Sequence, residues 1–261
     1  MSEIWRGTWV VAYRELLRFF GERSRMLSSF AMPLLFLVIF GAGFTKSIGA
    51  LAPGVNFIQF MFPGIIAMNV LTSSLFAGIS VVWDREYGFL KEILVAPIGR
   101  TGIVLGKAIG GTIVALIQSL MLLVLAPILG VRLSPAIVAS MIPLVVILSL
   151  GLSGLGILIA SFMRSQQGFQ ILIQILIFPL IFMAGVFFPI NNVPTWLEVI
   201  SKVNPLTYGV DAIRQVFLGG GGSLGVSVLG HTMTVLDEVL LVGVLGAVLL
   251  GSAVLAFNRE L

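Results

Sequence analysis

Six long runs of mostly apolar residues constrain this chain more than any other feature of its sequence. They lie at roughly 26–45, 57–82, 103–126, 136–162, 169–189 and 235–257. A helix needs about 20 apolar residues to cross the hydrocarbon core of a bilayer, and each run is close to that length or longer. The sequence therefore predicts an all-α integral membrane protein with six transmembrane helices.

The composition excludes a soluble protein of this length. Of the 261 residues, 58% are hydrophobic and only 10% are charged, whereas about 25% are charged in a typical globular domain. The chain has no cysteine and a single histidine, His231, which excludes disulfides and a histidine-rich metal site. The few carboxylates are too scattered to form an acid/base pair. We therefore expect no catalytic residue, no metal site and no cofactor bound by this chain.

The basic residues are distributed unequally between the two sides of the predicted bundle. One side carries ten, which are Arg6, Arg14, Arg18, Arg23, Arg25, Arg85, Lys91, Arg100, Arg164 and Arg259. The other side carries four, which are Lys46, Arg132, Lys202 and Arg214. Lys107 falls near the start of the third run and is counted on neither side. Because short cytoplasmic loops are enriched in Lys and Arg, we expect both termini in the cytoplasm. This pattern is compatible with the inner (plasma) membrane of a bacterium or archaeon.

Residues 1–25 are predicted to form an amphipathic helix, which precedes the permease region 26–261. One helical face carries Trp5, Trp9, Tyr13, Leu16 and Phe20, and another carries Arg14, Arg18, Glu22 and Arg25. Such a helix is typical of the membrane interface, with aromatic side chains at the depth of the headgroups. The alternative is a helix packed against the cytoplasmic underside of the protein itself.

The connection at about 190–234 is the longest between predicted spans. It contains two helical pieces, PTWLEVISKV and NPLTYGVDAIRQVF, and the second has Asn204 as its N-cap and Pro205 at its first position. The chain stays apolar up to Pro189 before this connection begins. We therefore expect 190–217 to form a re-entrant segment on the outer side.

The interiors of the predicted spans hold few polar side chains. Asn69, Gln118 and Gln174 are neutral amides, and no Asp, Glu or Arg lies near the centre of a run. Hydrogen bonds between helices explain these amides better than a translocation path does, although both remain open. Proton relays in membranes are usually marked by ionisable residues within the spans. The sequence therefore shows no obvious residues for a proton-coupled pump.

The segment GIVLGKA at 102–108 resembles a phosphate-binding loop only superficially. Such a loop needs four residues between its glycines and a Ser or Thr after its lysine, whereas here three residues separate the glycines and Ala108 follows Lys107. Gly106 and Gly110 instead form a GxxxG pair, which favours close approach of two helices.

Charge is concentrated in WDREYGFLKEILVAPIGR at 83–100, between the second and third runs. From Arg85 to Ala96 the apolar residues follow a helical period, and Pro97 favours the end of the helix. Such a helix can insert its apolar side into the groove of a partner or rest on the membrane. A solvated connecting helix fits the pattern equally well.

Two motifs resemble those of ABC type 2 exporter permeases, the membrane subunits of ATP-binding cassette exporters. REYGFLKEILVAPIGR at 85–100 is similar to their cytoplasmic coupling helix, particularly in daunorubicin-resistance-type drug export permeases. Many of those relatives carry Thr and Glu at the positions of Phe89 and Lys91. NPLTYGVDAIR at 204–214, after FFPINNVPTWL, resembles their outer signature. The likeness covers essentially the whole chain.

The resemblance implies a homodimer in which each copy docks one ATPase subunit, and ATP and Mg would bind to that partner. The coupling helix would span 84–97, with docking residues Arg85, Glu86, Gly88, Phe89, Leu90, Lys91, Glu92, Leu94 and Pro97. The outer signature would comprise Asn204, Pro205, Tyr208, Asp211 and Arg214. If Asp211 and Arg214 are exposed, their spacing allows an ion pair on the helix surface.

The function implied is ATP-driven export of amphipathic drug-like or lipid-like compounds. One alternative within the same family is an exporter of lipid-linked polysaccharide or oligosaccharide. The third to fifth predicted spans contain few aromatic residues to line a wide channel, so this alternative ranks second. A gradient-driven carrier or channel without an ATPase is the alternative from a different class.

Overall fold

The computed structural model describes residues 3–48, 57–88, 99–190, 193–219, 225–228 and 231–260. Its helices are α1 (Glu3–Gly21), α2 (Arg23–Ile48), α3 (Phe57–Phe76), α4 (Ile79–Glu86), α6 (Arg100–Leu125), α7 (Pro135–Phe162), α8 (Gln166–Phe182), α9 (Thr195–Val203), α10 (Pro205–Leu218) and α11 (Val235–Glu260). A short 3-10 helix (Ala126–Leu129) extends α6, and β1 (Ser227–Val228) pairs antiparallel with β2 (His231–Thr232).

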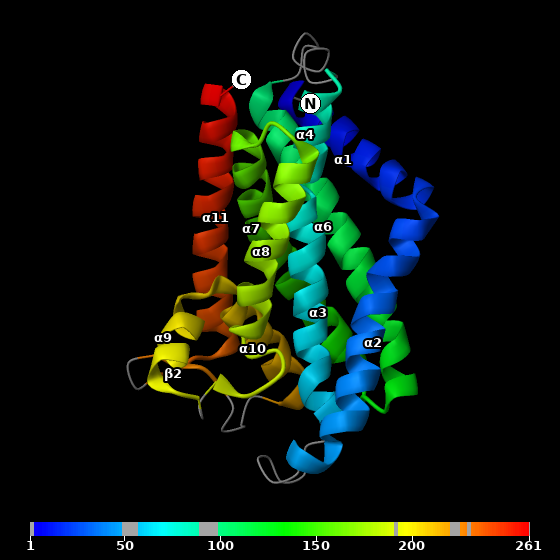
Figure 1. Ribbon diagram of the computed structural model, residues 1–261, viewed down its shortest axis with the longest axis vertical. Coiled ribbons are helices and arrows are strands. Elements are labelled where there is room, and N and C mark those ends of the chain that lie inside the picture. The colour runs from blue at the N-terminus through cyan, green and yellow to red at the C-terminus, as the bar shows by residue number, and fades with distance from the viewer. Residues whose placement is uncertain are drawn as a thin grey trace.

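The long helices form an elongated bundle with two distinct ends (Figure 1). The proximal end holds both chain termini, α1, the end of α4 and the turn from α7 to α8. The distal end holds α9, α10 and the β1–β2 hairpin. The arrangement agrees with the predicted alternation of loops, because the termini and the end of α4 lie at the same end.

In the part of the chain that the structure describes, four helical segments are long and apolar enough to cross a membrane: Phe57–Glu86, Arg100–Leu129, Pro135–Phe162 and Val235–Arg259. Within the described residues, Ala31–Gly41 and Gln166–Phe182 are apolar but shorter. A nearly all-helical fold with apolar helices of spanning length is therefore confirmed, whereas the count of six spans and the re-entrant segment stay predictions. The fifth predicted span is shorter than expected because α8 ends at Phe182 and Gly185 takes a φ of 71°.

Small residues allow the central helices to pack closely. α7 lies against α11, and a Cβ added to Gly151 would meet the Cα atom of Gly246 at 2.7 Å. α3 is the most enclosed helix, with an unbroken buried stretch from Phe60 to Leu71. The run predicted as one span over 57–82 is divided at Ala77 and Gly78, where α3 gives way to α4. Gly78 packs against the backbone of Gly156 in α7 at this break.

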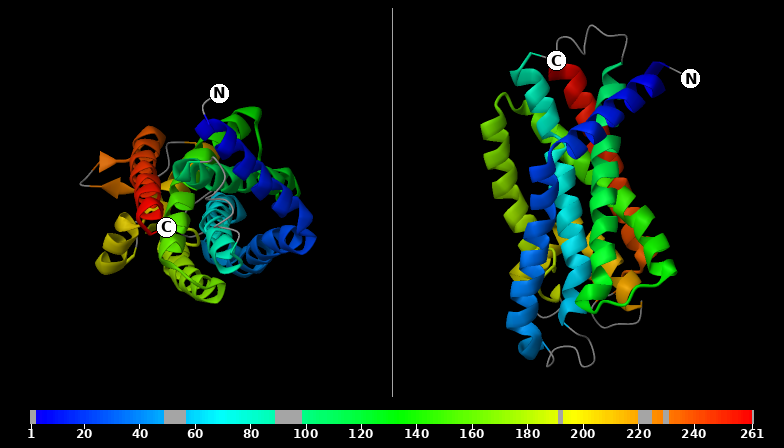
Figure 2. Two further views of the ribbon diagram at one scale, coloured as in Figure 1. Left: turned by 90° about the horizontal axis from the view of Figure 1, so that it is seen from above. Right: turned by 90° about the vertical axis from the view of Figure 1, so that its right-hand side faces the viewer.

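Helix α1 crosses the proximal end obliquely and leads into α2 (Figure 2). Trp5, Trp9, Tyr13 and Phe20 are more than half exposed, as the predicted interfacial face requires. The opposite face packs on α6, because a Cβ on Gly106 would meet the Thr8 carbonyl oxygen at 2.7 Å. Within the predicted range 1–25, α1 combines an exposed aromatic face with a face packed on the protein itself, and its place at the membrane interface stays a prediction.

Candidate functional site

Five polar side chains from three helices meet inside the proximal end and form the proximal charge cluster, which comprises Arg14, Glu15, Ser80, Asp84 and Lys107. Arg14 Nη2 donates to both Asp84 oxygens at 2.7 and 2.8 Å. Lys107 Nζ donates to Asp84 Oδ2 at 2.7 Å and to Ser80 Oγ at 2.8 Å. It also lies 3.5 Å from Glu15 Oε1. Asp84 thereby joins α1 and α6 to the end of α4.

The proximal charge cluster is electrically balanced, and its members are mostly buried apart from Arg14, whose side chain is 40% exposed. The side chains of Asp84 and Lys107 are 3% and 1% exposed, and Glu15 is 13% exposed. Burial of an isolated charge is costly, whereas a paired and hydrogen-bonded charge is tolerated. Two cations face two carboxylates here, so removal of any one leaves an uncompensated charge. The cluster therefore requires α1, α4 and α6 to stay together.

The glycines of α6 bring α1 close enough for these contacts. A Cβ on Gly106 would meet Val11 Cβ at 2.7 Å, and a Cβ on Gly110 would meet Glu15 Cβ at 2.8 Å. The GxxxG pair, which was predicted to bring two helices together, thus allows α1 to pack closely against α6. Lys107 lies between these two glycines and points from the same helix into the cluster. Sequence reasoning missed this role, although an ionisable residue within an apolar run is itself a signal.

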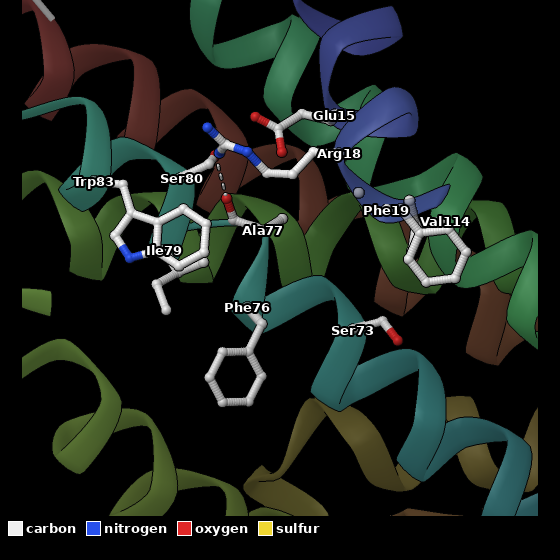
Figure 3. A pocket seen from close by; sticks show the side chains of 11 residues that line it. Glu15, Arg18, Phe19, Ser73, Phe76, Ala77, Ile79, Ser80, Trp83 and Val114 are labelled. Carbon is white, nitrogen blue, oxygen red and sulfur yellow. Dashed lines mark hydrogen bonds between the residues drawn. The ribbon is translucent and has the colours of Figure 1, made fainter. Parts of the chain in front are cut away.

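A pocket adjoins the cluster between α1, the α3–α4 break and α6 (Figure 3). The guanidinium of Arg18 lies 5.0 Å from the ring centre of Trp83, a cation–π contact. Glu15 and Arg18 lie on one side of the pocket, whereas Phe76 and Ser73 lie on another. The polar face of α1 is therefore directed partly toward the protein.

The first predicted docking residues bind the turn between α7 and α8. Arg85 Nη1 donates to the carbonyl oxygens of Ser161 at 3.0 Å and Met163 at 2.8 Å, at the C-terminal end of α7. Glu86 Oε2 accepts from the backbone N–H of Gln166 at 2.9 Å, at the start of α8. A cation at a helix C-terminus and an anion at a helix N-terminus both satisfy free backbone groups and the helix dipole.

The first residues of the predicted coupling helix over 84–97 belong to the end of α4 and do not begin a new helix. Asp84, Arg85 and Glu86 belong to α4, and Gly88 takes a φ of 81°, which ends the helical path. Glycine adopts this left-handed conformation at little cost. The other predicted docking residues lie outside the described residues; they are Phe89, Leu90, Lys91, Glu92, Leu94 and Pro97.

The outer signature forms a buried, hydrogen-bonded start to α10. Asn204 caps the helix by accepting from Leu206 N at 3.0 Å, and its amide donates to the Leu180 carbonyl at 2.7 Å. Pro205 occupies the first helical position, as predicted. The Tyr208 hydroxyl donates to the Lys202 carbonyl at 2.6 Å. These contacts fasten α10 to α8 and α9.

The surface ion pair expected between Asp211 and Arg214 is not formed. Both side chains are buried, and Arg214 Nη2 donates to the Gly185 carbonyl at 2.6 Å while its guanidinium lies 4.0 Å from the Phe60 ring centre. Asp211 instead accepts from Val226 N at 2.7 Å. Burial lowers the pKa of Arg214 to about 10, and the neighbouring carboxylates oppose that change. The pair was expected only on an exposed helix surface, and this part of α10 is buried.

A second buried acid, Glu238, lies beside this signature and was missed by sequence reasoning. It is 0% exposed at the start of α11. Gln215 Nε2 lies 3.3 Å from both Glu238 Oε2 and Asp211 Oδ2. We define the distal acid cluster as Asp211, Gln215 and Glu238. The sequence VLDEVLL does not indicate that Glu238 is buried, because an acidic residue in the first turn of a helix is usually solvated.

The three amides proposed as a candidate path do not gather at one place. Asn69 donates to the Ser29 carbonyl at 3.1 Å and joins α3 to α2. Gln118 accepts from Ser73 and joins α6 to α3. Gln174 lies exposed on α8. For Asn69 and Gln118 the structure favours the predicted hydrogen bonds between helices, and a role of any of the three in translocation stays a prediction.

Apolar helical segments of spanning length define a multi-pass membrane protein. Residues 6–218 match the family model described as "ABC-2 type transporter", and the chain belongs to that family. The chain is 31% identical to a protein named transport permease ycf38 from Cyanophora paradoxa. The 196 aligned residues cover 74% of this chain and 67% of that protein.

Two further relatives carry more specific names. The multidrug ABC transporter permease YbhR of Escherichia coli strain K12 is 30% identical over 171 residues, which cover 64% of this chain and 45% of YbhR. The chain thus matches less than half of that protein. Nodulation protein J of Rhizobium meliloti strain 1021 is 26% identical over 198 residues, which cover 75% of each chain.

Proposed function

We propose that this chain is the membrane subunit of an ATP-driven exporter and that its segment 84–97 docks a separate ATPase. That ATPase would hold ATP and Mg, and two copies of this chain would assemble with two copies of it. The cargo would be an amphipathic drug-like or lipid-like compound, taken from the cytoplasm or the inner leaflet. Membership of a permease family supports the ATPase partner, and the name of YbhR supports a drug-like cargo. Both termini would face the cytoplasm of a bacterial or archaeal plasma membrane.

One observation carries this proposal: three consecutive residues at the base of the segment contact four different helices. Asp84 binds Arg14 of α1 and Lys107 of α6. Arg85 binds the end of α7, and Glu86 binds the start of α8. A displacement of the segment after Gly88 would therefore act on α1, α6, α7 and α8 together. This is the connection that an ATPase needs in order to move a transmembrane bundle.

Copurification and transport of Glu86 variants test the docking proposal. Glu86→Arg reverses the charge and removes the acceptor for Gln166 N, whereas Glu86→Gln keeps an oxygen acceptor and removes only the charge. We expect Glu86→Arg to lose the ATPase subunit in gentle detergent, or to retain it with ATP hydrolysis uncoupled from transport. Glu198→Arg is the matched control, because Glu198 pairs with Lys202 at the distal end.

The outcomes separate docking from local structure. Loss of the partner in both Glu86 variants indicates that the carboxylate contacts the ATPase. Loss in Glu86→Arg alone indicates that the α4–α8 contact positions the docking segment. A wild-type chain that purifies alone in several detergents, or a Glu86→Arg complex with normal coupling, would overturn the proposal. Transport that survives collapse of the proton gradient while ATP is present would exclude a proton-driven carrier.

A further inference from the structure

The pocket beside α1 holds a cation that no described carboxylate neutralises. Among the described residues that line this pocket, Glu15 and Arg18 are the charged ones. Glu15 Oε1 already lies 3.5 Å from Lys107 Nζ, within the balanced proximal charge cluster. Arg18 forms no ion pair with a carboxylate of the described residues, and its Nη1 atom is buried without a hydrogen-bond partner there. Because a buried N–H group normally has an acceptor, an oxygen ligand is expected at this position.

The contact between Arg18 and Trp83 holds the cation but does not supply this acceptor. The guanidinium carbon lies 5.0 Å from the Trp83 ring centre. The face of the ring attracts the positive charge, but it offers no oxygen atom to accept a hydrogen bond. A guanidinium presents its N–H donors in a planar fork that matches the oxygens of a phosphate or a carboxylate. The chemistry of the pocket therefore fits an oxyanion.

The pocket is small and can be reached from the surface. Its volume is about 20 Å³, which is enough for one oxygen atom of the size of a water molecule. Figure 3 shows the Arg18 side chain extending from α1 over the pocket, next to Trp83 of α4. Four of the lining residues are only half-buried: Arg18, Ser73, Phe76 and Trp83. A ligand would therefore place a single oxygen inside the pocket and keep its other atoms at the mouth.

The surroundings of Arg18 on α1 favour a membrane lipid as the source of that oxygen. Tyr13, Leu17 and Phe20 lie within about one turn of Arg18, and each is more than half exposed. An exposed aromatic and apolar face beside arginine residues is typical of a helix at the bilayer interface. Lipid phosphates are the abundant anions at that depth. A lipid phosphate therefore fits this position better than free phosphate or a protein carboxylate does.

We propose that Arg18 and Trp83 form a binding site for the phosphate group of a phospholipid in the leaflet next to α1. One phosphate oxygen accepts from Arg18 Nη1 inside the pocket, while the acyl chains remain in the bilayer. Because Arg18 belongs to α1 and Trp83 to α4, the bound lipid stabilises the contact between these helices. The site requires no ATPase, so it is independent of the docking proposed above.

Native mass spectrometry of the purified full chain in detergent measures this site in the absence of an ATPase. The probes are phosphatidylglycerol and a diacylglycerol with the same acyl chains, which lacks the phosphate. We expect Arg18→Gln to weaken phosphatidylglycerol binding about tenfold, as for loss of one hydrogen bond to a charged group. Binding of the diacylglycerol should not change. Arg6→Gln is the matched control, because Arg6 is exposed on the same helix and does not line the pocket.

The outcomes separate a lipid phosphate from the other candidate ligands. Displacement of phosphatidylglycerol by millimolar inorganic phosphate would indicate a site for free phosphate and overturn the lipid assignment. A wild-type chain that binds the diacylglycerol as tightly as phosphatidylglycerol would overturn the proposal without any variant. Equal losses in Arg18→Gln and Arg6→Gln would also overturn it, because they indicate diffuse surface charge. If Arg18→Gln keeps the lipid but loses a copurifying ATPase, the pocket accepts a protein carboxylate and the proposal is wrong.

Discussion

Lys107 Nζ lies 2.7 Å from Asp84 Oδ2, and neither side chain is more than 3% exposed. Asp84 is near the end of α4 and is the first residue of the proposed docking segment 84–97, whereas Lys107 is in the second turn of α6. Their contact closes the loop between these helices at its base. The same carboxylate binds Arg14, so the loop and α1 share one anchor.

Removal of the Asp84 charge should destabilise the protein strongly. Asp84→Asn leaves Lys107 buried without its closest counter-charge, and breaking a buried pair in this way typically costs about 3–5 kcal/mol. Lys107→Met in the same chain should restore part of the loss, because the stranded cation is then absent. Unfolding free energies of the single and double variants in detergent measure this coupling. A loss below about 1 kcal/mol would contradict a structural role for the pair.

Gly106→Ala should loosen α1 from α6. The added methyl would meet the Thr8 carbonyl oxygen and Val11 Cβ, both at 2.7 Å, so α1 must shift. Gly251→Ala is the control, because a Cβ there meets no atom within 4 Å; alanine should favour that helix by up to about 1 kcal/mol. The rate at which a protease removes α1 should rise for Gly106→Ala alone. Equal rates of cleavage for the two variants would contradict the packing of α1 against Gly106.

Arg85→Met should separate ATP hydrolysis from transport in the assembled complex. The variant loses two hydrogen bonds to carbonyl oxygens at the end of α7. The first turn of the docking segment is then no longer bonded to α7 through this side chain. We expect the ATPase subunit to copurify and ATP to turn over while transport falls several-fold. Arg164→Met, at an exposed position in the same turn, should transport normally. A matching effect of both variants would refute a specific role for Arg85.

Variants of the outer signature should lower transport and leave assembly intact. Tyr208→Ala removes the hydroxyl that binds the Lys202 carbonyl, and Asp211→Ala leaves Val226 N without its acceptor. Each lost hydrogen bond is worth about 1 kcal/mol, with more for a buried group left unpaired. Tyr208→Phe removes the hydroxyl but keeps the ring, so it separates the contribution of the hydrogen bond from that of ring packing. Transport into inverted vesicles is the measurement, and normal rates in both alanine variants would show that the outer signature has no role in transport.

The sequence predicted the elements that depend on local signals. Asn204 and Pro205 give the start of α10, and the GxxxG glycines give a close helix contact, because capping and small-residue packing are encoded at fixed spacings. The aromatic face of α1 followed from its helical period. These features need no knowledge of distant partners.

The buried charges depended on contacts that a single sequence does not reveal. Asp84 and Lys107 are 23 residues apart, and Asp84 and Arg14 are 70 apart. Glu238 reaches Gln215 across 23 residues. Each looks like a solvated charge near the end of an apolar run until the helices are assembled. The surface ion pair of Asp211 and Arg214 depended on exposure, and the burial of both residues likewise comes from distant helices.

Crosslinking from Tyr87 tests the central claim most directly. This side chain is 69% exposed and is one of the last described residues before 89–98. A photoreactive phenylalanine analogue at Tyr87, in membranes that transport, should form a covalent adduct with a separate ATPase subunit. The same analogue at Val203, which is 78% exposed at the distal end, should form none. Absence of the adduct from Tyr87 in actively transporting membranes would contradict docking at this segment.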